Sequence, residues 1–195
     1  LSEAIHIFSG AATISVDLLK WFESIGITIL QGIGMTEDCI YSHCNRVGRN
    51  EFGTVGLPFS RLKVKIANDG ELRLKGPSNM KGYYKEAGLT AEAFDEEGSL
   101  KTGDKGEIDR DGFLTIVGRI KDQFKTDKGK YVSPSPIEMK LLANPDVEQV
   151  CVVGMGIPQP IALTVLSAVG KTKSKEELIE SLSASLMGVN AGLES

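Results

Sequence analysis

The chain carries GIGMTE at residues 32–37, LKTGD at 100–104 and GRIKD at 118–122. These stretches place a hydroxyl, carboxylates and a guanidinium at the edges of expected strands and helices. Asp104 can accept hydrogen bonds from both hydroxyls of a ribose, and Arg119 can reach a ribose or a phosphate with its fork of donors. Thr36 followed by Glu37 can bond a phosphoryl oxygen and help to hold Mg²⁺. The three stretches in this order predict a nucleotide site.

Upstream of GIGMTE, the chain alternates between strand and helix patterns. The expected elements are a strand over residues 4–8, a loop of small residues over 9–12, a helix with Ile14, Leu18, Phe22 and Ile25 on one face, and a strand over 27–30. Ser15 is the expected N-cap of the helix and Gly26 its stop signal. The second strand leads directly into the GIGMTE loop. This order predicts a parallel sheet, with the ligand beyond the carboxyl ends of its strands.

The period changes from helix to strand after about residue 52. Apolar residues alternate with polar ones on both sides of the turn Asn68-Asp69-Gly70, and the pattern recurs around Arg110-Asp111-Gly112. Asp-Gly between alternating runs is a strong hairpin signal. We therefore expect a small antiparallel sheet or barrel, interrupted at residues 82–84 and by a short helix over 90–94.

The last third of the chain predicts a small α+β domain. After a lysine-rich connection, Ser135, Pro136 and Glu138 form the pattern of a capping box, which predicts a helix ending near residue 143. Strands over 149–153 and 162–168 follow. A final helix carries Leu178, Leu182, Leu186 and Val189 on one face.

Composition excludes several classes of protein. The 195 residues are 41% hydrophobic and 25% charged, which is typical of a globular protein, and the net charge of −4 argues against a general nucleic-acid binder. No apolar run has the length of a transmembrane segment. Three cysteines without a disulfide pattern suit a reducing compartment. We expect a cytoplasmic protein and leave peripheral membrane contact open.

Cys39, His43 and Cys44 lie close together in sequence and raise the question of a metal site. Zinc needs about four ligands, typically in paired short spacings, and the sequence holds no second pair. We interpret the two cysteines as buried thiols and His43 as a residue on a helix face.

Six stretches in this order resemble adenylate-forming enzymes: SGAA at 9–12, GMTE at 34–37, GYYK at 82–85, TGD at 102–104, GRIKD at 118–122 and GKYVSP at 129–134. The sequence resembles most closely the long-chain acyl-CoA synthetases, and the resemblance covers nearly the whole chain. It implies a mixed α+β fold. Residues 1–58 would end the α/β part of a large ATP- and acid-binding domain, 59–118 its β-barrel lobe, and 119–195 a hinge and an incomplete C-terminal lid domain. Both ends of the chain suggest a C-terminal fragment.

The resemblance also implies a reaction. The whole enzyme would be a fatty acid–CoA ligase that activates a fatty acid with ATP and Mg²⁺ as acyl-AMP, then transfers the acyl group to coenzyme A. Thr36 would bond phosphate, Glu37 would ligate Mg²⁺, and Asp104 and Arg119 would bind the ribose. The adenine slot would be lined by Gly10, Ala11, Ala12, Gly32, Ile33, Gly34 and Met35.

Further roles follow from the same resemblance. Lys121 matches the hinge about which the lid rotates, Lys125 a lysine that faces the active site during thioester formation, and Gly129 a residue beside the pantetheine path. Ile33 stands where the family usually has an aromatic residue that stacks on adenine, and Lys128 where many relatives have glycine. Tyr83 and Tyr84 are interpreted as packing residues.

Two elements of the family are not in this sequence. It contains no Ser/Thr/Gly-rich phosphate loop ending in Pro-Lys-Gly, and no lysine after Ser174 matches the one that drives adenylation. We therefore expect the isolated chain to be inactive.

Two alternatives remain at this point. The first is another adenylate-forming enzyme, either an aryl-acid ligase or a carrier-loading adenylation domain, since most of the acyl pocket would lie outside this chain. The second is a non-catalytic, β-rich interaction module that makes no nucleotide contact at Asp104 or Arg119.

Overall fold

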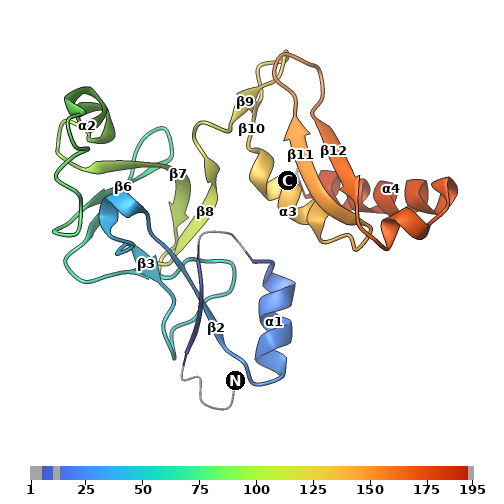
Figure 1. The fold of residues 1–195 in the computed structure, drawn as a ribbon, viewed down its shortest axis with the longest axis horizontal. Coiled ribbons are helices and arrows are strands. Elements are labelled where there is room, and N and C mark those ends of the chain that lie inside the picture. Colours follow the sequence, from blue (N-terminus) through green and yellow to red (C-terminus); the bar gives the residue numbers. More distant parts are fainter. Residues whose placement is uncertain (1–5, 11–13, 193–195) are drawn as a thin grey trace. The chain divides into compact units, whose positions relative to one another are not determined.

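The computed structural model describes residues 6–10 and 14–192. The chain forms two compact units, Leu1–Val117 and Gly118–Ser195, which are described separately (Figure 1). The expectations for Ala11, Ala12 and the start of the first strand lie outside the described residues. The mixed α+β fold is confirmed, whereas the boundaries 1–58, 59–118 and 119–195 stay a prediction.

The first sheet of unit 1 has the strand order β1-β2-β3-β4. Its strands are β1 (Ile7–Ser9), β2 (Ile29–Ile33), β3 (His43–Cys44) and β4 (Leu57–Pro58). β1 and β2 are parallel, as predicted, and β3 and β4 add to the sheet in antiparallel pairs. The helix α1 (Val16–Ser24) connects β1 to β2 and lies against β2 (Figure 1).

The N-cap of α1 is confirmed, but its predicted apolar face is wrong. The Ser15 hydroxyl accepts a hydrogen bond from the Leu18 backbone N–H at 3.2 Å. Leu19 is the buried residue of the helix, while Leu18 and Ile25 are 45% and 53% exposed. The buried stripe is therefore rotated by one residue from the predicted one, because helix α1 presents Leu19 to the sheet.

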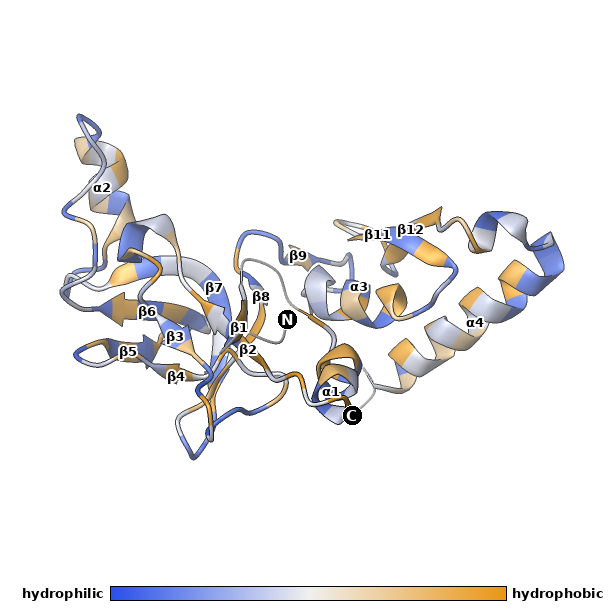
Figure 2. Ribbon diagram, turned by 60° about the horizontal axis from the view of Figure 1, so that its bottom comes forward, coloured by the Kyte–Doolittle hydropathy of each residue, from blue (hydrophilic) through white to orange (hydrophobic). Residues whose placement is uncertain are grey.

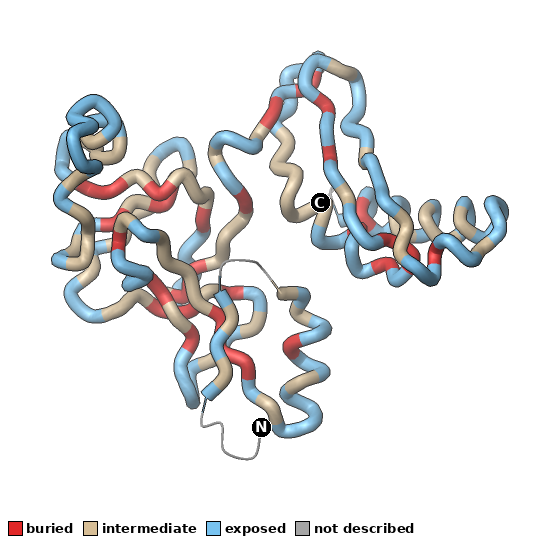
Figure 3. The backbone as a smooth tube through the Cα atoms, in the orientation of Figure 1, coloured by how far each residue is buried: buried red, intermediate tan, exposed pale blue. Residues whose placement is uncertain are grey.

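The second sheet of unit 1 is an antiparallel half-barrel with the order β5-β6-β7-β8. Its strands are β5 (Lys63–Ile66), β6 (Glu71–Lys75), β7 (Leu100–Ile108) and β8 (Leu114–Arg119), and α2 (Ala87–Ala93) lies between β6 and β7 in the chain. Both predicted hairpins are confirmed, with Gly70 and Gly112 at positive φ in the turns. Leu72, Leu74 and Leu114, each at most 1% exposed, form the core of this half-barrel (Figure 3).

Unit 2 packs two helices against two small antiparallel sheets. The elements are β9 (Phe124–Lys125), β10 (Tyr131–Val132), α3 (Pro134–Leu142), β11 (Val147–Val153), β12 (Ile161–Leu166), the 3₁₀ turn η2 (Gly170–Thr172) and α4 (Lys175–Ala191). Hydrophobic and hydrophilic residues alternate along α4 (Figure 2). The core of the unit consists of Phe124, Leu141, Val152 and Val189.

A buried polar network joins the end of α3 to α4 in unit 2. Asp146 is fully buried, and it accepts hydrogen bonds from the Lys173 ammonium at 2.7 Å and the Ser181 hydroxyl at 2.6 Å. These two donors lower the pKa of Asp146, so its carboxylate stays charged. The network fixes the position at which α4 begins.

The predicted capping box of α3 is wrong. The helix begins two residues earlier, with Ser133 as its N-cap, and the Ser133 hydroxyl accepts a hydrogen bond from the Gln123 amide instead of capping the helix. Glu138 does not reach back to the helix start, because its carboxylate accepts the Val152 backbone N–H of β11 at 2.8 Å. The tertiary contact replaces the local one.

Two motif stretches lie in different elements from those predicted. β2 continues through Gly32 and Ile33, since β3 pairs with these two residues. The stretch 100–104 forms the first five residues of the long strand β7. The short helix α2 begins at Ala87, three residues before the predicted start.

No helix in the described part of the chain has the length and apolar character needed to cross a membrane.

Candidate nucleotide site

Gly10 and Gly32 meet at the carboxyl edge of the parallel strands. Ser9 in β1 is level with Gln31 in β2, so the chain leaves both strands at the same edge of the sheet. A Cβ on Gly10 would lie 3.5 Å from the Gly32 carbonyl oxygen. The loop after β1 and the GIGMTE stretch are therefore neighbours, at the edge where α/β sheets bind ligands.

Two glycines of GIGMTE are required by the fold itself. A Cβ on Gly32 would lie 2.9 Å from the carbonyl oxygen of His43 in the paired strand. A Cβ on Gly34 would lie 2.5 Å from the Ile40 backbone, because the chain turns back on itself there. Close packing of the backbone explains both glycines without a ligand.

Ile33 packs against the core of the neighbouring half-barrel. Its side chain contacts the cluster of Leu72, Leu74 and Leu114. The residue at the expected adenine position thus joins the two sheets of unit 1.

Asp38 holds the loop that presents Thr36 and Glu37, and the sequence reasoning missed it. Thr36, Glu37 and Asp38 form the 3₁₀ turn η1, in which Asp38 is fully buried and accepts the Met35 backbone N–H at 2.9 Å. Burial raises the pKa of this carboxyl, with a smaller contribution from the neighbouring Glu37. The available signal was the spacing of three from Met35, which is the spacing of a capping residue.

Glu37 is held by a segment that lies more than forty residues later in the chain. The Tyr83 hydroxyl donates a hydrogen bond to its Oε1 at 2.8 Å, and the Met80 backbone N–H donates to its carbonyl oxygen at 2.6 Å. The bond to Glu37 raises the pKa of Tyr83. The interpretation of Tyr83 as a packing residue is therefore wrong. Tyr84, 87% exposed, lies near the Lys85 ammonium.

Thr102, Gly103 and Asp104 form a bulge in β7. Glu71 of β6 is level with Lys105 and Arg73 with Lys101, so β7 holds two extra residues at this point. Gly103 has a φ of +72°, and its backbone N–H donates to the Glu71 carboxylate at 3.1 Å. A bulge bends the strand and redirects its side chains.

The Thr102 hydroxyl fixes both ends of this bulge. It donates to the Leu72 carbonyl oxygen at 2.8 Å and accepts the Asp104 backbone N–H at 3.1 Å. Asp104, the last residue of the bulge, is half-buried. Because Leu72 belongs to the cluster that Ile33 contacts, the GIGMTE stretch and the TGD bulge are anchored on the same core.

The expected lid residues lie in unit 2. Arg119 ends β8, Lys121 follows it, and Lys125 lies in β9 with its ammonium 5.4 Å from the centre of the Tyr131 ring. Gly129 has a φ of +80° in the turn between β9 and β10, and a Cβ there would lie 3.6 Å from the Lys125 side chain. The structure thus brings Lys125 and Gly129 together.

The described residues hold no cluster of three or more His, Cys, Asp or Glu side chains suited to a metal ion. Cys39 is exposed and Cys44 is half-buried, so the expectation of two buried thiols is wrong. His43 lies in a strand and not on a helix, with its Nδ1 2.7 Å from the Ser42 hydroxyl.

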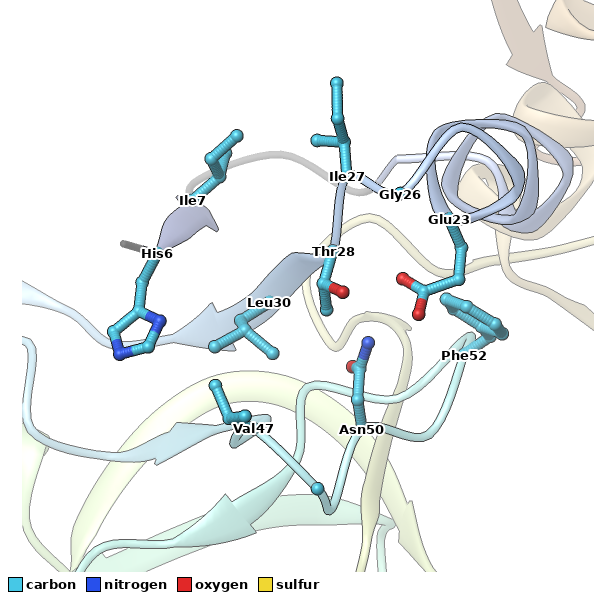
Figure 4. A pocket seen from close by; sticks show the side chains of 11 residues that line it. His6, Ile7, Glu23, Gly26, Ile27, Thr28, Leu30, Val47, Asn50 and Phe52 are labelled. Carbon is cyan, nitrogen blue, oxygen red and sulfur yellow. The ribbon is translucent and has the colours of Figure 1, made fainter. Parts of the chain in front are cut away.

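A cavity of about 530 Å³ opens at the other end of β1 and β2 (Figure 4). It is lined by residues from the start of both strands, from α1 and from the loop after β3, among them His6, Ile27, Val47, Asn50 and Phe52. This cavity lies at the amino edge of the parallel strands and does not include the motif residues.

Two family models match the chain. The model described as AMP-binding enzyme matches residues 1–84, and the model described as AMP-binding enzyme C-terminal domain matches residues 121–195. Together they cover most of the sequence.

Curated relatives include two mycobacterial proteins. The chain is 42% identical over 161 residues to the putative fatty-acid–CoA ligase fadD11 of Mycobacterium tuberculosis, and 39% identical over 150 residues to the long-chain-fatty-acid–CoA ligase FadD15 of Mycobacterium bovis. The matches cover 82% and 77% of this chain but only 28% and 25% of the relatives. The chain thus spans about a quarter of the length of these relatives.

Solved structures share the fold. The anthranilate CoA ligase AuaEII with anthranoyl-AMP matches with a TM-score of 0.79 and 26% identity, covering 93% of this chain and 37% of that one. The o-succinylbenzoate CoA synthetase of Bacillus subtilis with its acyl-adenylate intermediate matches with a TM-score of 0.79 and 29% identity, covering 92% and 39%.

We expect Gly103→Ala to destabilise unit 1 by about 1–2 kcal/mol, because an L-residue is strained at this φ. A Cβ at this position meets nothing within 4 Å, so the strain is the only cost. Gly88→Ala is the matched control, since its Cβ also meets nothing, and in helix α2 it should stabilise by about 0.5–1 kcal/mol. Urea unfolding measures both, and equal effects of the two changes would contradict the role of the bulge.

The buried His43 should make the protein less stable to unfolding in acid. Burial lowers its pKa from 6.5 to about 4, so the folded state keeps the ring neutral while the unfolded state takes up a proton. The neutral ring costs the folded state nothing above pH 6.5. As the pH falls from 6.5 towards 4, uptake of the proton by the unfolded state lowers the free energy of unfolding by about 3 kcal/mol. Urea unfolding across this range should show a steeper loss for the wild type than for His43→Gln. Parallel curves for the two proteins would show that the buried ring is not responsible.

Proposed function

Because the chain belongs to the AMP-binding enzyme family, we propose that it supplies part of the nucleotide site of an ATP-dependent fatty acid–CoA ligase. The observation that carries this proposal is the common anchoring of the GIGMTE stretch and the TGD bulge on the Leu72, Leu74 and Leu114 core. A fatty acid as the substrate is supported by the relatives named as fatty-acid–CoA ligases. Their sequence identity to this chain is higher than that of the solved ligases of aryl acids.

The residues of unit 1 divide the binding of the nucleotide among them. Asp104, in the bulge, accepts hydrogen bonds from the ribose hydroxyls. Thr36, in the turn η1, donates a hydrogen bond to a phosphate oxygen. Gly10, Gly32, Gly34 and Met35 line the approach to adenine, and Ile33 supplies an apolar edge there. At Gly10, where a Cβ would make only an ordinary contact with the protein, the small residue lets a flat base come close to the backbone.

Glu37 fits the role of a Mg²⁺ ligand. A hydroxyl and a single carboxylate, completed by phosphate oxygens and water, are the donors that Mg²⁺ accepts. Tyr83 uses one of the two carboxylate oxygens of Glu37, and the second can face a cation. When bound, Mg²⁺ supplies positive charge that offsets the charge of the ATP phosphates.

The residues of unit 2 would act when the lid closes. Arg119 assists at the ribose, and Lys121 is the hinge residue whose backbone absorbs the rotation. Lys125 approaches the active site during transfer to coenzyme A, with Gly129 beside the pantetheine chain. The Lys125 side chain lies beside the Gly129 turn, which supports the proposal that these two residues act at the same place.

Asp104→Ala tests the nucleotide site. The variant should bind AMP about tenfold to a hundredfold more weakly, because it loses hydrogen bonds to a charged acceptor. Asp111→Ala, in the exposed turn between β7 and β8, is the matched control and should bind AMP as the wild type does. Calorimetric titration of AMP into the 195-residue chain measures both. Unchanged affinity in Asp104→Ala would favour a non-catalytic interaction module.

We further propose that the 195-residue chain alone does not activate an acid. Its sequence lacks the phosphate loop of the family, and charge that develops on the phosphates requires positioned donors. No exchange of labelled pyrophosphate into ATP is expected with palmitate, benzoate or amino acids. Turnover that depends on any of these carboxylates would overturn the proposal, and the preferred acid would identify the ligase class.

A further inference from the structure

One short segment makes two hydrogen bonds to Glu37. The Met80 backbone N–H bonds its carbonyl oxygen at 2.6 Å, and the Tyr83 hydroxyl bonds its Oε1 at 2.8 Å. The first contact fixes the backbone of the turn η1, and the second fixes the rotation of the side chain. Both come from the connection between β6 and α2.

Tyr83 is itself held in place by Thr90 of α2. The Tyr83 backbone N–H donates to the Thr90 hydroxyl at 2.9 Å, and this hydroxyl donates to the Glu86 carbonyl oxygen at 2.8 Å. Gly82 has a φ of +149°, and a Cβ there would lie 2.6 Å from the Thr90 side chain. The glycine lets the segment approach α2 so closely that the phenol is directed at Glu37.

The geometry points to Tyr83 as the positioning residue for the Glu37 carboxylate; this inference rests on the proposed role of Glu37 as a Mg²⁺ ligand. By donating to Oε1, the phenol restrains the carboxylate and leaves Oε2 to meet the cation. Partners that orient a metal ligand in this way contribute about tenfold to a hundredfold to metal affinity.

The adjacent tyrosine provides a matched control. Tyr84 has the same side chain but is 87% exposed, and its ring lies 5.3 Å from the Lys85 ammonium. Tyr83→Phe and Tyr84→Phe each remove one hydroxyl and little volume. A general effect of losing a tyrosine hydroxyl would appear in both variants.

The experiment measures the affinity of Mn²⁺ for the complex of the 195-residue chain with ATP, by enhancement of water proton relaxation. Four proteins are compared: wild type, Tyr83→Phe, Tyr84→Phe and Glu37→Gln. We expect Mn²⁺ to bind Tyr83→Phe about tenfold more weakly than wild type and Tyr84→Phe equally well. Binding of ATP in EDTA should be the same for the wild type, Tyr83→Phe and Tyr84→Phe.

The outcomes separate the inference from the proposed function. If Glu37→Gln weakens Mn²⁺ binding and Tyr83→Phe does not, the role of Tyr83 is overturned while the metal site stands. If neither change alters the affinity for Mn²⁺, or if the wild type with ATP binds no Mn²⁺, Glu37 is not a metal ligand. The positioning role of Tyr83 is then wrong as well. A loss of ATP affinity in EDTA for Tyr83→Phe would indicate a merely structural contact and also overturn the inference.

Discussion

The contact of Ile33 with the Leu72, Leu74 and Leu114 cluster is the constraint on which the architecture of unit 1 depends. It joins the end of a parallel strand pair to the core of an antiparallel half-barrel. Burying apolar surface at this junction stabilises both sheets together, at roughly 25 cal/mol for each Å² removed from water. The same contact sets where the GIGMTE loop emerges relative to β6, whose Leu72 carbonyl also anchors the bulge in β7.

The proposed ligand groups sit on irregular backbone that regular elements hold in place. Asp104 is the last residue of a bulge whose Gly103 and Asp104 backbone N–H groups bond Glu71 and Thr102, and Glu37 lies in a 3₁₀ turn closed by the buried Asp38. Irregular backbone redirects side chains away from the faces of a sheet, and here each irregularity is paired with polar groups from neighbouring segments. These hydrogen bonds hold the turn η1 and the bulge in β7 in fixed positions on the two sheets.

Local patterns predicted the fold well where neighbouring residues decide the structure, as in the hairpins around Gly70 and Gly112 and the Ser15 cap. They failed where a distant partner competes. Glu138 bonds β11 instead of its own helix, and Tyr83 bonds Glu37 across 46 residues. The order of the motifs predicted the candidate residues, but spacing alone could not reveal the bulge at Gly103, because a bulge depends on the register with β6.

The central claim is that side chains from GIGMTE and TGD serve one nucleotide, and amide chemical shifts test it most directly. AMP would be titrated into ¹⁵N-labelled chain while the resonances of Gly34, Thr36, Glu37, Gly103 and Asp104 are followed. The account predicts that the amides of both segments shift together, with a single dissociation constant. Shifts confined to one segment, or two unrelated binding curves, would contradict a shared site.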